Sequence, residues 1–282
     1  MPELPEVETI ARGVDARVRG DRIAEAWFGS HREPFKTPAA NQAKGLEGRR
    51  ILEVHRTGKH IVVELGRGDG RSAGSRDDAP AAQWIVHLGM TGRLLVTTPD
   101  APLAPHTHAR LRLESGREIR FVDPRRFGRL ELRKLKADTG FAAQGLEPLT
   151  VGSGDFAELF RGRKLAIKAA LLNQTLLTGV GNIYADESLF RAGIRPRKRA
   201  GRLTRVELER LRVALKAVLE DAIRLGGSSV SDYVDAEGVR GFFQLEHRVY
   251  QRAGQPCRAC GSLIRRVVVG GRSTHYCPRC QV

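Results

Sequence analysis

The chain has 282 residues, enough for two domains with cores of their own, and 41% of them are hydrophobic, as in ordinary globular proteins. Lysine and arginine number 48 against 32 aspartates and glutamates, which gives a net charge of +16. This charge predicts a polyanionic partner. Nucleic acid is favoured over an anionic membrane, because no apolar run could span a bilayer and no basic amphipathic helix dominates the sequence. Glu3, Glu6 and Glu8 stand where a signal peptide needs basic and apolar residues, so we expect a cytosolic protein.

Pro2 follows the initiator methionine directly and becomes a free secondary amine once Met1 is removed. An α-amino group with a pKa of about 7.7 to 8.0 is partly unprotonated near neutrality, and nearby cations lower that pKa. Such an amine can attack an aldehyde-like carbon and form a Schiff base. In the alternative interpretation, Pro5 and Glu6 only begin a helix. These residues alone favour neither interpretation.

The first 135 residues predict a β-rich domain. Only residues 6–14 have helical periodicity, with Val7, Ile10 and Val14 on one face. Short apolar or alternating segments predict strands over 51–54, 60–65, 84–88, 110–113, 118–121 and 129–132. We therefore expect a β-sandwich or barrel that carries an N-terminal helix. Residues 66–82 have no apolar anchor and predict a mobile surface loop.

Helical periodicity takes over from about Phe156. We expect helices over 164–177 and 185–192, and a longer helix that begins at Thr204 with a capping box to Glu207 and stops before Gly226. The turn over 179–182 leaves backbone N–H groups and the Asn182 amide at a helix N-terminus, which suits a phosphate. Asn182 as the N-cap of an ordinary helix hairpin is equally consistent with these residues.

Four cysteines lie in two CxxC pairs near the C-terminal end, at Cys257, Cys260, Cys277 and Cys280. Two such pairs complete the tetrahedral shell of a structural zinc ion, and two disulfides are the weaker alternative in a reducing cytosol. Strands over 264–269 and 272–276 with a Gly270-Gly271 turn predict a β-ribbon between the pairs. Arg272 near its tip is either a solvated side chain or a phosphate contact.

Five segments together resemble the formamidopyrimidine-DNA glycosylase family, bacterial enzymes that remove oxidised purines from DNA. They are MPELPEVET at the start, HLGMTGRL at 87–94, DPRRFG at 123–128, LLTGVGNIYADESLFRAGIRP at 176–196, and CRACG with GRSTHYCPRCQ at the end. The resemblance covers essentially the whole chain in the right order. It implies an α+β protein of two domains, a β-sandwich with flanking helices and a helix–two-turn–helix domain ending in a zinc β-ribbon finger.

The resemblance implies catalytic roles for four residues. Pro2 would attack C1′ of the damaged nucleotide and displace the base, and Glu3 would handle protons at the sugar ring oxygen. Lys59 would assist elimination, and Arg272 would serve the second, δ-elimination step. Without the resemblance, Glu3 reads as a helix-start carboxylate and Lys59 as a solvated lysine.

The resemblance also implies DNA contacts. Met90, Arg125 and Phe127 would fill the space left by the extruded nucleotide, although Met90 and Phe127 would otherwise be assigned to the core. We call these three residues the wedge cluster. Residues 228–240 would close over the extruded purine. Phosphate contacts would come from His106, Arg163, Lys168 and Asn182.

The implied domains are a catalytic β-sandwich over 1–135, a helix–two-turn–helix domain over 150–226, a capping loop and linker over 227–246, and a zinc finger over 247–282. We expect a monomer that acts on damaged duplex DNA and holds one zinc ion. Two alternatives stay open: a relative that prefers oxidised pyrimidines, and a zinc-ribbon DNA-binding protein without catalytic activity. The second would have no need of Pro2, Glu3 or Lys59.

Overall fold

The computed structural model describes residues 2–30, 34–67, 79–135, 140–229 and 233–282. The chain divides into two compact units. The first comprises Met1–Ala142 and Ser228–Gly241, and the second comprises Ala143–Gly227 and Phe242–Val282. Most of the surface loop that we expected over 66–82 lies outside the described residues.

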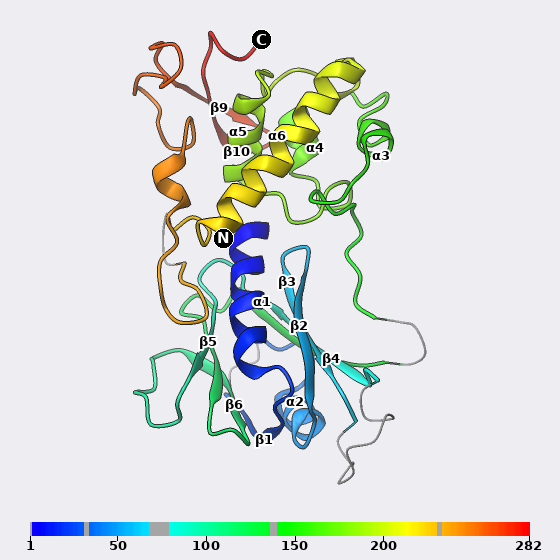
Figure 1. The fold of residues 1–282 in the computed structure, drawn as a ribbon, viewed down its shortest axis with the longest axis vertical. Coiled ribbons are helices and arrows are strands. Elements are labelled where there is room, and N and C mark those ends of the chain that lie inside the picture. The colour runs from blue at the N-terminus through cyan, green and yellow to red at the C-terminus, as the bar shows by residue number, and fades with distance from the viewer. Residues whose placement is uncertain (1, 31–33, 68–78, 136–139, 230–232) are drawn as a thin grey trace. The chain divides into compact units, whose positions relative to one another are not determined.

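The first unit contains two antiparallel sheets of four strands each, with the orders β1-β6-β7-β5 and β2-β3-β4-β8 (Figure 1). The strands are β1 (Ile23–Phe28), β2 (Ile51–Thr57), β3 (His60–Leu65), β4 (Ala82–His87), β5 (Arg93–Thr97), β6 (Thr107–Leu113), β7 (Glu118–Val122) and β8 (Arg129–Lys134). The six strands expected from the sequence are all present. Strands β1 and β5 were not predicted.

Both sheets contribute apolar side chains to one core, including Ile61 and Trp84 from one sheet and Leu111 and Phe121 from the other. Helix α1 (Leu4–Val18) packs against β2 and β3 and buries Val7, Ile10 and Val14, as the helical periodicity predicts. The helix is longer than the expected 6–14. A second helix, α2 (Ala39–Leu46), was not predicted because it buries only Gln42 and Leu46 and so lacks an apolar stripe.

The second unit is helical and ends in a β-ribbon. Its helices are α3 (Ser153–Glu158), α4 (Ile167–Leu171), α5 (Asn182–Arg191) and α6 (Arg205–Arg224), with short 3-10 turns η1 (Ala200–Arg202) and η2 (Phe243–Glu246). The ribbon pairs β9 (Arg265–Val269) with β10 (Arg272–Tyr276), and Val269 lies opposite Arg272. None of the described helices is both long and apolar enough to cross a bilayer.

Two expectations for this unit need correction. The helix expected over 164–177 is only α4, because the Asn173 side chain accepts hydrogen bonds from the backbone and hydroxyl of Thr175 and turns the chain. Helix α5 begins at Asn182 with Gly181 as its N-cap, so Asn182 itself is not the N-cap. The capping box between Thr204 and Glu207 is present at the start of α6, as predicted.

Candidate functional site

The chain start is held by a carboxylate that sequence reasoning treated only as a helix-start charge. Pro2 and Glu3 are buried immediately before α1, and Glu3 is its N-cap. One oxygen of Glu6 accepts a hydrogen bond of 2.8 Å from the Glu3 backbone N–H, and the other accepts one of 2.8 Å from the Ser228 N–H. Glu6 therefore joins the start of the chain to the segment that begins at Ser228, within one unit.

Tyr233 makes a second link between this segment and α1. Its hydroxyl lies 3.5 Å from the Glu6 carbonyl oxygen, and its ring is part of the core of the first unit. Burial, with the Glu6 carboxylate nearby, raises the pKa of Tyr233 well above its ordinary value. The phenol therefore stays protonated and able to donate.

Lys59 lies in the turn between β2 and β3, half-buried, beside Gly58 with a φ of +62°. Arg56 holds this turn to α1, because its guanidinium lies 2.7 Å from the Glu8 carboxylate and donates to the Gly58 carbonyl at 3.2 Å. His60, the next residue along the chain after Lys59, lies opposite His87 of β4, and the centroids of the two rings are 4.9 Å apart. Arg56 thus ties the turn that carries Lys59 to the helix that Pro2 precedes.

The wedge cluster lies at the surface around one buried carboxylate, Asp123. The Thr91 hydroxyl donates to Asp123 Oδ1 at 2.6 Å, and the Gly128 backbone N–H donates to Oδ2 at 2.7 Å. The Arg125 N–H also lies 3.3 Å from Oδ1. Asp123 therefore joins the turn that carries Met90 to the loop that carries Arg125 and Phe127, and it was not singled out from the sequence.

Exposure argues against core packing for the two apolar members of the cluster. Met90 is 41% exposed and Phe127 is 50% exposed, and the Arg125 guanidinium lies 4.9 Å from the centre of the Phe127 ring. Gly89 keeps them close, because its φ is +63° and an added Cβ would lie 2.5 Å from the Phe127 backbone. The cluster is a surface feature held in place from beneath.

Two of the expected phosphate contacts, His106 and Arg163, have the exposure that such a contact needs, and a third, Asn182, lies at the start of a helix. His106 is exposed with a φ of +65°, and its carbonyl accepts a hydrogen bond from the Asp123 N–H at 3.0 Å. Arg163 is exposed, with its guanidinium against the Leu159 carbonyl. Asn182 is half-buried at the start of α5 and donates to the Ser273 carbonyl at 3.0 Å.

Lys168 does not fit the phosphate contact expected of it. Its side chain has no exposed surface, and its ammonium group lies 2.7 Å from Asp186 Oδ1. The ammonium also donates to the Ser273 carbonyl at 2.9 Å and the Thr274 hydroxyl at 2.8 Å. A buried ammonium needs oxygen partners, and these partners satisfy it inside the protein. Lys168 therefore supports β10, which begins with the exposed Arg272.

Asp186 completes this support. It is fully buried on α5, and its second oxygen accepts a hydrogen bond of 2.8 Å from the His275 backbone N–H. The next residue, Glu187, accepts from three successive backbone N–H groups at Arg248, Val249 and Tyr250, at distances of 2.8 to 3.0 Å. Adjacent carboxylates on α5 thus anchor both β10 and the chain that leads to the ribbon.

The four cysteines fit a tetrahedral zinc ion. Their sulfur atoms all lie within 4.8 Å of one another, with Cys260 and Cys277 3.4 Å apart and Cys257 and Cys280 3.9 Å apart. Zinc–sulfur bonds of about 2.3 Å place tetrahedral sulfurs about 3.8 Å apart. Hydrogen bonds with Ser262 lower the pKa of Cys260 to about 6, whereas burial and the other three thiols raise that of Cys280. Four sulfur ligands at this spacing suit a zinc ion, which would hold all four as thiolates.

Three family models match consecutive parts of the chain. They describe the formamidopyrimidine-DNA glycosylase N-terminal domain over residues 1–130, its H2TH domain over 145–234, and a zinc finger found in FPG and IleRS over 254–282. The chain belongs to the formamidopyrimidine-DNA glycosylase family. The curated formamidopyrimidine-DNA glycosylase of Solibacter usitatus is 45% identical over 281 residues, which is 100% of this chain and 99% of the relative.

Solved structures agree with this assignment. The MutM (Fpg) protein of Thermus thermophilus has a TM-score of 0.83 at 41% identity, covering 99% of this chain and 98% of that one. A variant of Lactococcus lactis Fpg in complex with DNA containing Fapy-dG has a TM-score of 0.85 at 33% identity, covering 99% of both chains. Wild-type Lactococcus lactis Fpg has also been solved with DNA containing an oxidised pyrimidine, with a TM-score of 0.83 at 33% identity, covering 99% of both chains.

These comparisons confirm several expectations from the sequence. The α+β fold of two domains, with a helix–two-turn–helix domain and a zinc finger, is that of the family. The cysteine cluster and the zinc-finger match together establish one structural zinc site. The chain is an enzyme of DNA repair, so the interpretation as a DNA-binding protein without activity was wrong.

Proposed function

We propose that this enzyme removes oxidised purines from duplex DNA as a bifunctional glycosylase and abasic-site lyase, with Pro2 as the nucleophile. The observation that carries the proposal is the chain start, where the proline precedes α1 and Glu6 ties this start to Ser228. Removal of Met1 frees the amine. A backbone held in place around the reactive amine lowers the entropy cost of reaching the geometry in which the amine reacts.

The proposed reaction begins at C1′ of the damaged nucleotide. The Pro2 nitrogen forms a bond to C1′ as the bond from C1′ to the base breaks, and the departing base takes a proton. Glu3 protonates the ring oxygen, the sugar opens, and an iminium ion joins protein and DNA. Loss of a C2′ proton expels the 3′ phosphate, and the δ-elimination that follows expels the 5′ phosphate. Hydrolysis of the imine then releases the sugar fragment.

The other residues have separate proposed roles. Lys59, held to α1 through Arg56, assists β-elimination, and Arg272 assists δ-elimination. The wedge cluster occupies the space of the extruded nucleotide, and Arg125 donates to the cytosine left unpaired. Residues 228–240, of which 230–232 lie outside the described residues, cover the extruded base, and Ser228 and Tyr233 tie this segment to Glu6. His106, Arg163 and Asn182 contact phosphates.

The substrate class rests on the relatives. A complex of the Lactococcus lactis variant with DNA containing Fapy-dG supports a purine lesion. The second candidate, an oxidised pyrimidine, is supported by the other Lactococcus lactis complex. We further propose that the enzyme works as a monomer in the cytoplasm, because each chain carries one nucleophile and the substrate is chromosomal DNA.

Borohydride trapping tests the proposal. The protein is incubated with duplex DNA carrying 8-oxoguanine opposite cytosine, reduced, and resolved on a denaturing gel. We expect a covalent band that is absent for Pro2→Gly and for a protein extended by two residues before Pro2. Glu3→Gln should slow excision by about 10²–10⁴-fold, as loss of a general acid does.

Two controls make the trapping decisive. Mass spectrometry confirms that Met1 is absent from each sample, and a duplex carrying an oxidised pyrimidine is run in parallel. Full trapping by Pro2→Gly would overturn the assignment of the nucleophile. Faster excision of the pyrimidine lesion than of 8-oxoguanine would select the second substrate class.

A further inference from the structure

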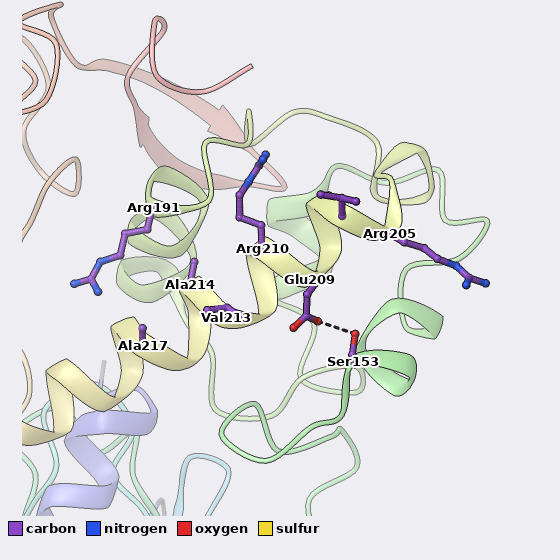
Figure 2. A pocket seen from close by; sticks show the side chains of 9 residues that line it. Ser153, Arg191, Arg205, Glu209, Arg210, Val213, Ala214 and Ala217 are labelled. Atoms are coloured by element: carbon purple, nitrogen blue, oxygen red, sulfur yellow. Dashed lines mark hydrogen bonds between the residues drawn. The ribbon is translucent and has the colours of Figure 1, made fainter.

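Helix α6 presents an unusual apolar stripe to solvent. Val206 is 74% exposed and Val213 is 52% exposed, and both lie on the side away from the buried leucines of the helix. Together with Ala214 and Ala217 they line a hollow of about 780 Å³, which we call the α6 groove, and we call its two valines the valine floor. Figure 2 shows Val213, Ala214 and Ala217 on α6. Exposed apolar residues gathered in a hollow, rather than scattered singly, indicate a binding surface.

The rim of the α6 groove is cationic. It carries Arg191, Arg205 and Arg210 and a single carboxylate, Glu209 (Figure 2). That carboxylate is already satisfied, because Arg212 lies 2.6 Å from one oxygen and the Ser153 hydroxyl donates to the other at 2.7 Å. These contacts lower the pKa of Glu209 to about 2. Glu209 therefore stays ionised at neutral pH, and its negative charge is offset by Arg212 rather than by the three rim arginines.

The rim arginines also keep donors for a ligand. The Arg210 Nε donates to the Ala192 carbonyl at 2.6 Å, and the Arg191 Nη1 lies 2.8 Å from Asp221. Each guanidinium has five N–H donors, so these contacts use only part of its capacity. In Figure 2 the Arg205 side chain extends from the start of α6 away from the floor of the groove.

A second hollow continues the α6 groove toward α3. Ser153, Arg205 and Glu209 line both hollows, and the second, of about 400 Å³, is also lined by Phe160 and Leu203. The stretch of α6 from Val206 to Ala217 has a length of about 17 Å at 1.5 Å per residue. An extended peptide of about five or six residues has the same length.

We propose that the α6 groove binds an acidic peptide segment of another protein, with apolar side chains on the valine floor and carboxylates on the arginine rim. Duplex DNA fits poorly, because a phosphate backbone has nothing to place on Val206 and Val213. A second copy of this chain also fits poorly, because a symmetric contact would set one arginine rim against another. No residue of the groove has a role in the proposed reaction, so the proposal does not depend on that reaction.

Fluorescence anisotropy of the full-length protein tests this proposal. The probe is a fluorescein-labelled peptide of about ten residues that alternates aspartate with leucine or phenylalanine. We expect it to bind with a Kd of about 1–100 μM. Two control peptides replace the apolar residues by serine or the aspartates by lysine, and neither should bind. Val213→Asp and Arg205→Glu should each weaken binding at least about tenfold, or about 1.4 kcal/mol. The matched charge reversal Lys216→Glu, on α6 but outside the groove lining, should change it less than about twofold.

Competition separates the groove from the DNA-binding surface. Saturating undamaged duplex should leave the peptide bound, and cleavage of an abasic site should be equal in Val213→Asp and the unmodified protein. Displacement of the peptide by DNA, or normal binding by both groove variants, would overturn the proposal. A dimer in sedimentation velocity that Val213→Asp dissolves would overturn it in favour of a second copy.

Discussion

The two units hold their exposed residues on different kinds of buried anchor. In the first unit, Asp123 accepts hydrogen bonds from the Thr91 hydroxyl and from the Arg125 and Gly128 backbones, all of them neutral donors. In the second, Asp186 forms an ion pair with Lys168, and neither side chain has exposed surface. Each anchor supports a segment that carries exposed side chains. Asp123 supports the loops with Met90 and Arg125, and Asp186 with Lys168 supports the strand with Arg272.

This difference between the two anchors predicts that substitutions in them will destabilise the protein to different extents. Where a buried carboxylate accepts several neutral hydrogen bonds, leaving one donor without an acceptor lowers the free energy of unfolding by about 1–3 kcal/mol. A buried ion pair that loses one partner leaves an uncompensated charge, which costs about 3–5 kcal/mol. The ribbon support in the second unit should therefore be the more fragile of the two.

The largest effect is expected for Lys168→Met. It leaves the Asp186 charge buried without its cation and should lower the free energy of unfolding by about 3–5 kcal/mol. Adding Asp186→Asn, which keeps an oxygen for the His275 N–H, should restore most of that loss. Lys216→Met, at a lysine on α6 whose side chain is 44% exposed, serves as the matched control in chemical denaturation and should change stability by less than about 0.5 kcal/mol.

The salt dependence of DNA binding distinguishes this support from a phosphate contact. Loss of a phosphate contact flattens the slope of log K against log salt by about 0.9. For Lys168→Met, measured at temperatures where the variant is folded, we expect the slope of log K against log salt to equal that of the unmodified protein. A flattened slope with unchanged stability would mean that Lys168 contacts DNA after all.

A smaller effect is expected for Asp123→Asn. The amide oxygen can still accept from the Gly128 N–H, and the Thr91 hydroxyl can turn to accept from the amide. The Arg125 N–H then faces a second donor, so the wedge cluster should loosen at a cost of about 1–3 kcal/mol. Because the wedge cluster is then held less firmly, excision of the lesion from duplex DNA should also slow. Asp100→Asn, on an exposed loop of the same unit, is the control. Unchanged excision by a destabilised Asp123→Asn protein would show that Asp123 only stabilises the fold.

The smallest stability effect is a dependence on pH near the wedge cluster. Burial, with His60, Lys59 and Arg129 nearby, lowers the pKa of His87 from 6.5 to about 4, and its neutral Nδ1 accepts from the Gly89 N–H at 3.2 Å. Between pH 6.5 and 4 the unfolded chain binds the proton and the folded protein does not, so stability is full above pH 6.5 and falls as the pH drops to 4. We expect a loss of about 1–2 kcal/mol.

His87→Gln checks this assignment by equilibrium denaturation across the same pH range. Glutamine does not titrate there, so the variant should lose less stability on acidification than the unmodified protein. An identical pH dependence would assign the effect to other groups, such as His247, whose pKa burial also lowers to about 4.

The sequence was most informative where a local rule decides the structure. The CxxC spacing predicted the cysteine cluster, the Thr204 and Glu207 pair predicted the start of α6, and Gly270-Gly271 predicted the turn of the ribbon. Strand β1 was missed because the exposure of its residues does not alternate, and its pairing with β6 comes from far along the chain. Local patterns do not report such long-range pairing.

The anchors beneath the site were missed for a related reason. Lys168 looks like any cationic residue until β10 is placed over it, more than a hundred residues later in the sequence. Asp123, Asp186 and Glu6 each satisfy donors that folding brings together. For Asp123 a signal was available, because Asp-Pro favours the start of a turn. For Asp186 and Glu6 the sequence carries no comparable signal.

The central claim is that the wedge cluster acts before any bond breaks, whereas Pro2 carries the chemistry. The most direct measurement compares Met90→Ala with the unmodified protein on two substrates, 8-oxoguanine opposite cytosine in duplex DNA and a pre-formed abasic site. Extrusion of a stacked base costs a few kcal/mol, and the abasic site has no base to extrude. Met90→Ala should therefore lose at least about tenfold on 8-oxoguanine and less than about threefold on the abasic site. Equal losses on both substrates would contradict this claim and show that Met90 only supports the fold.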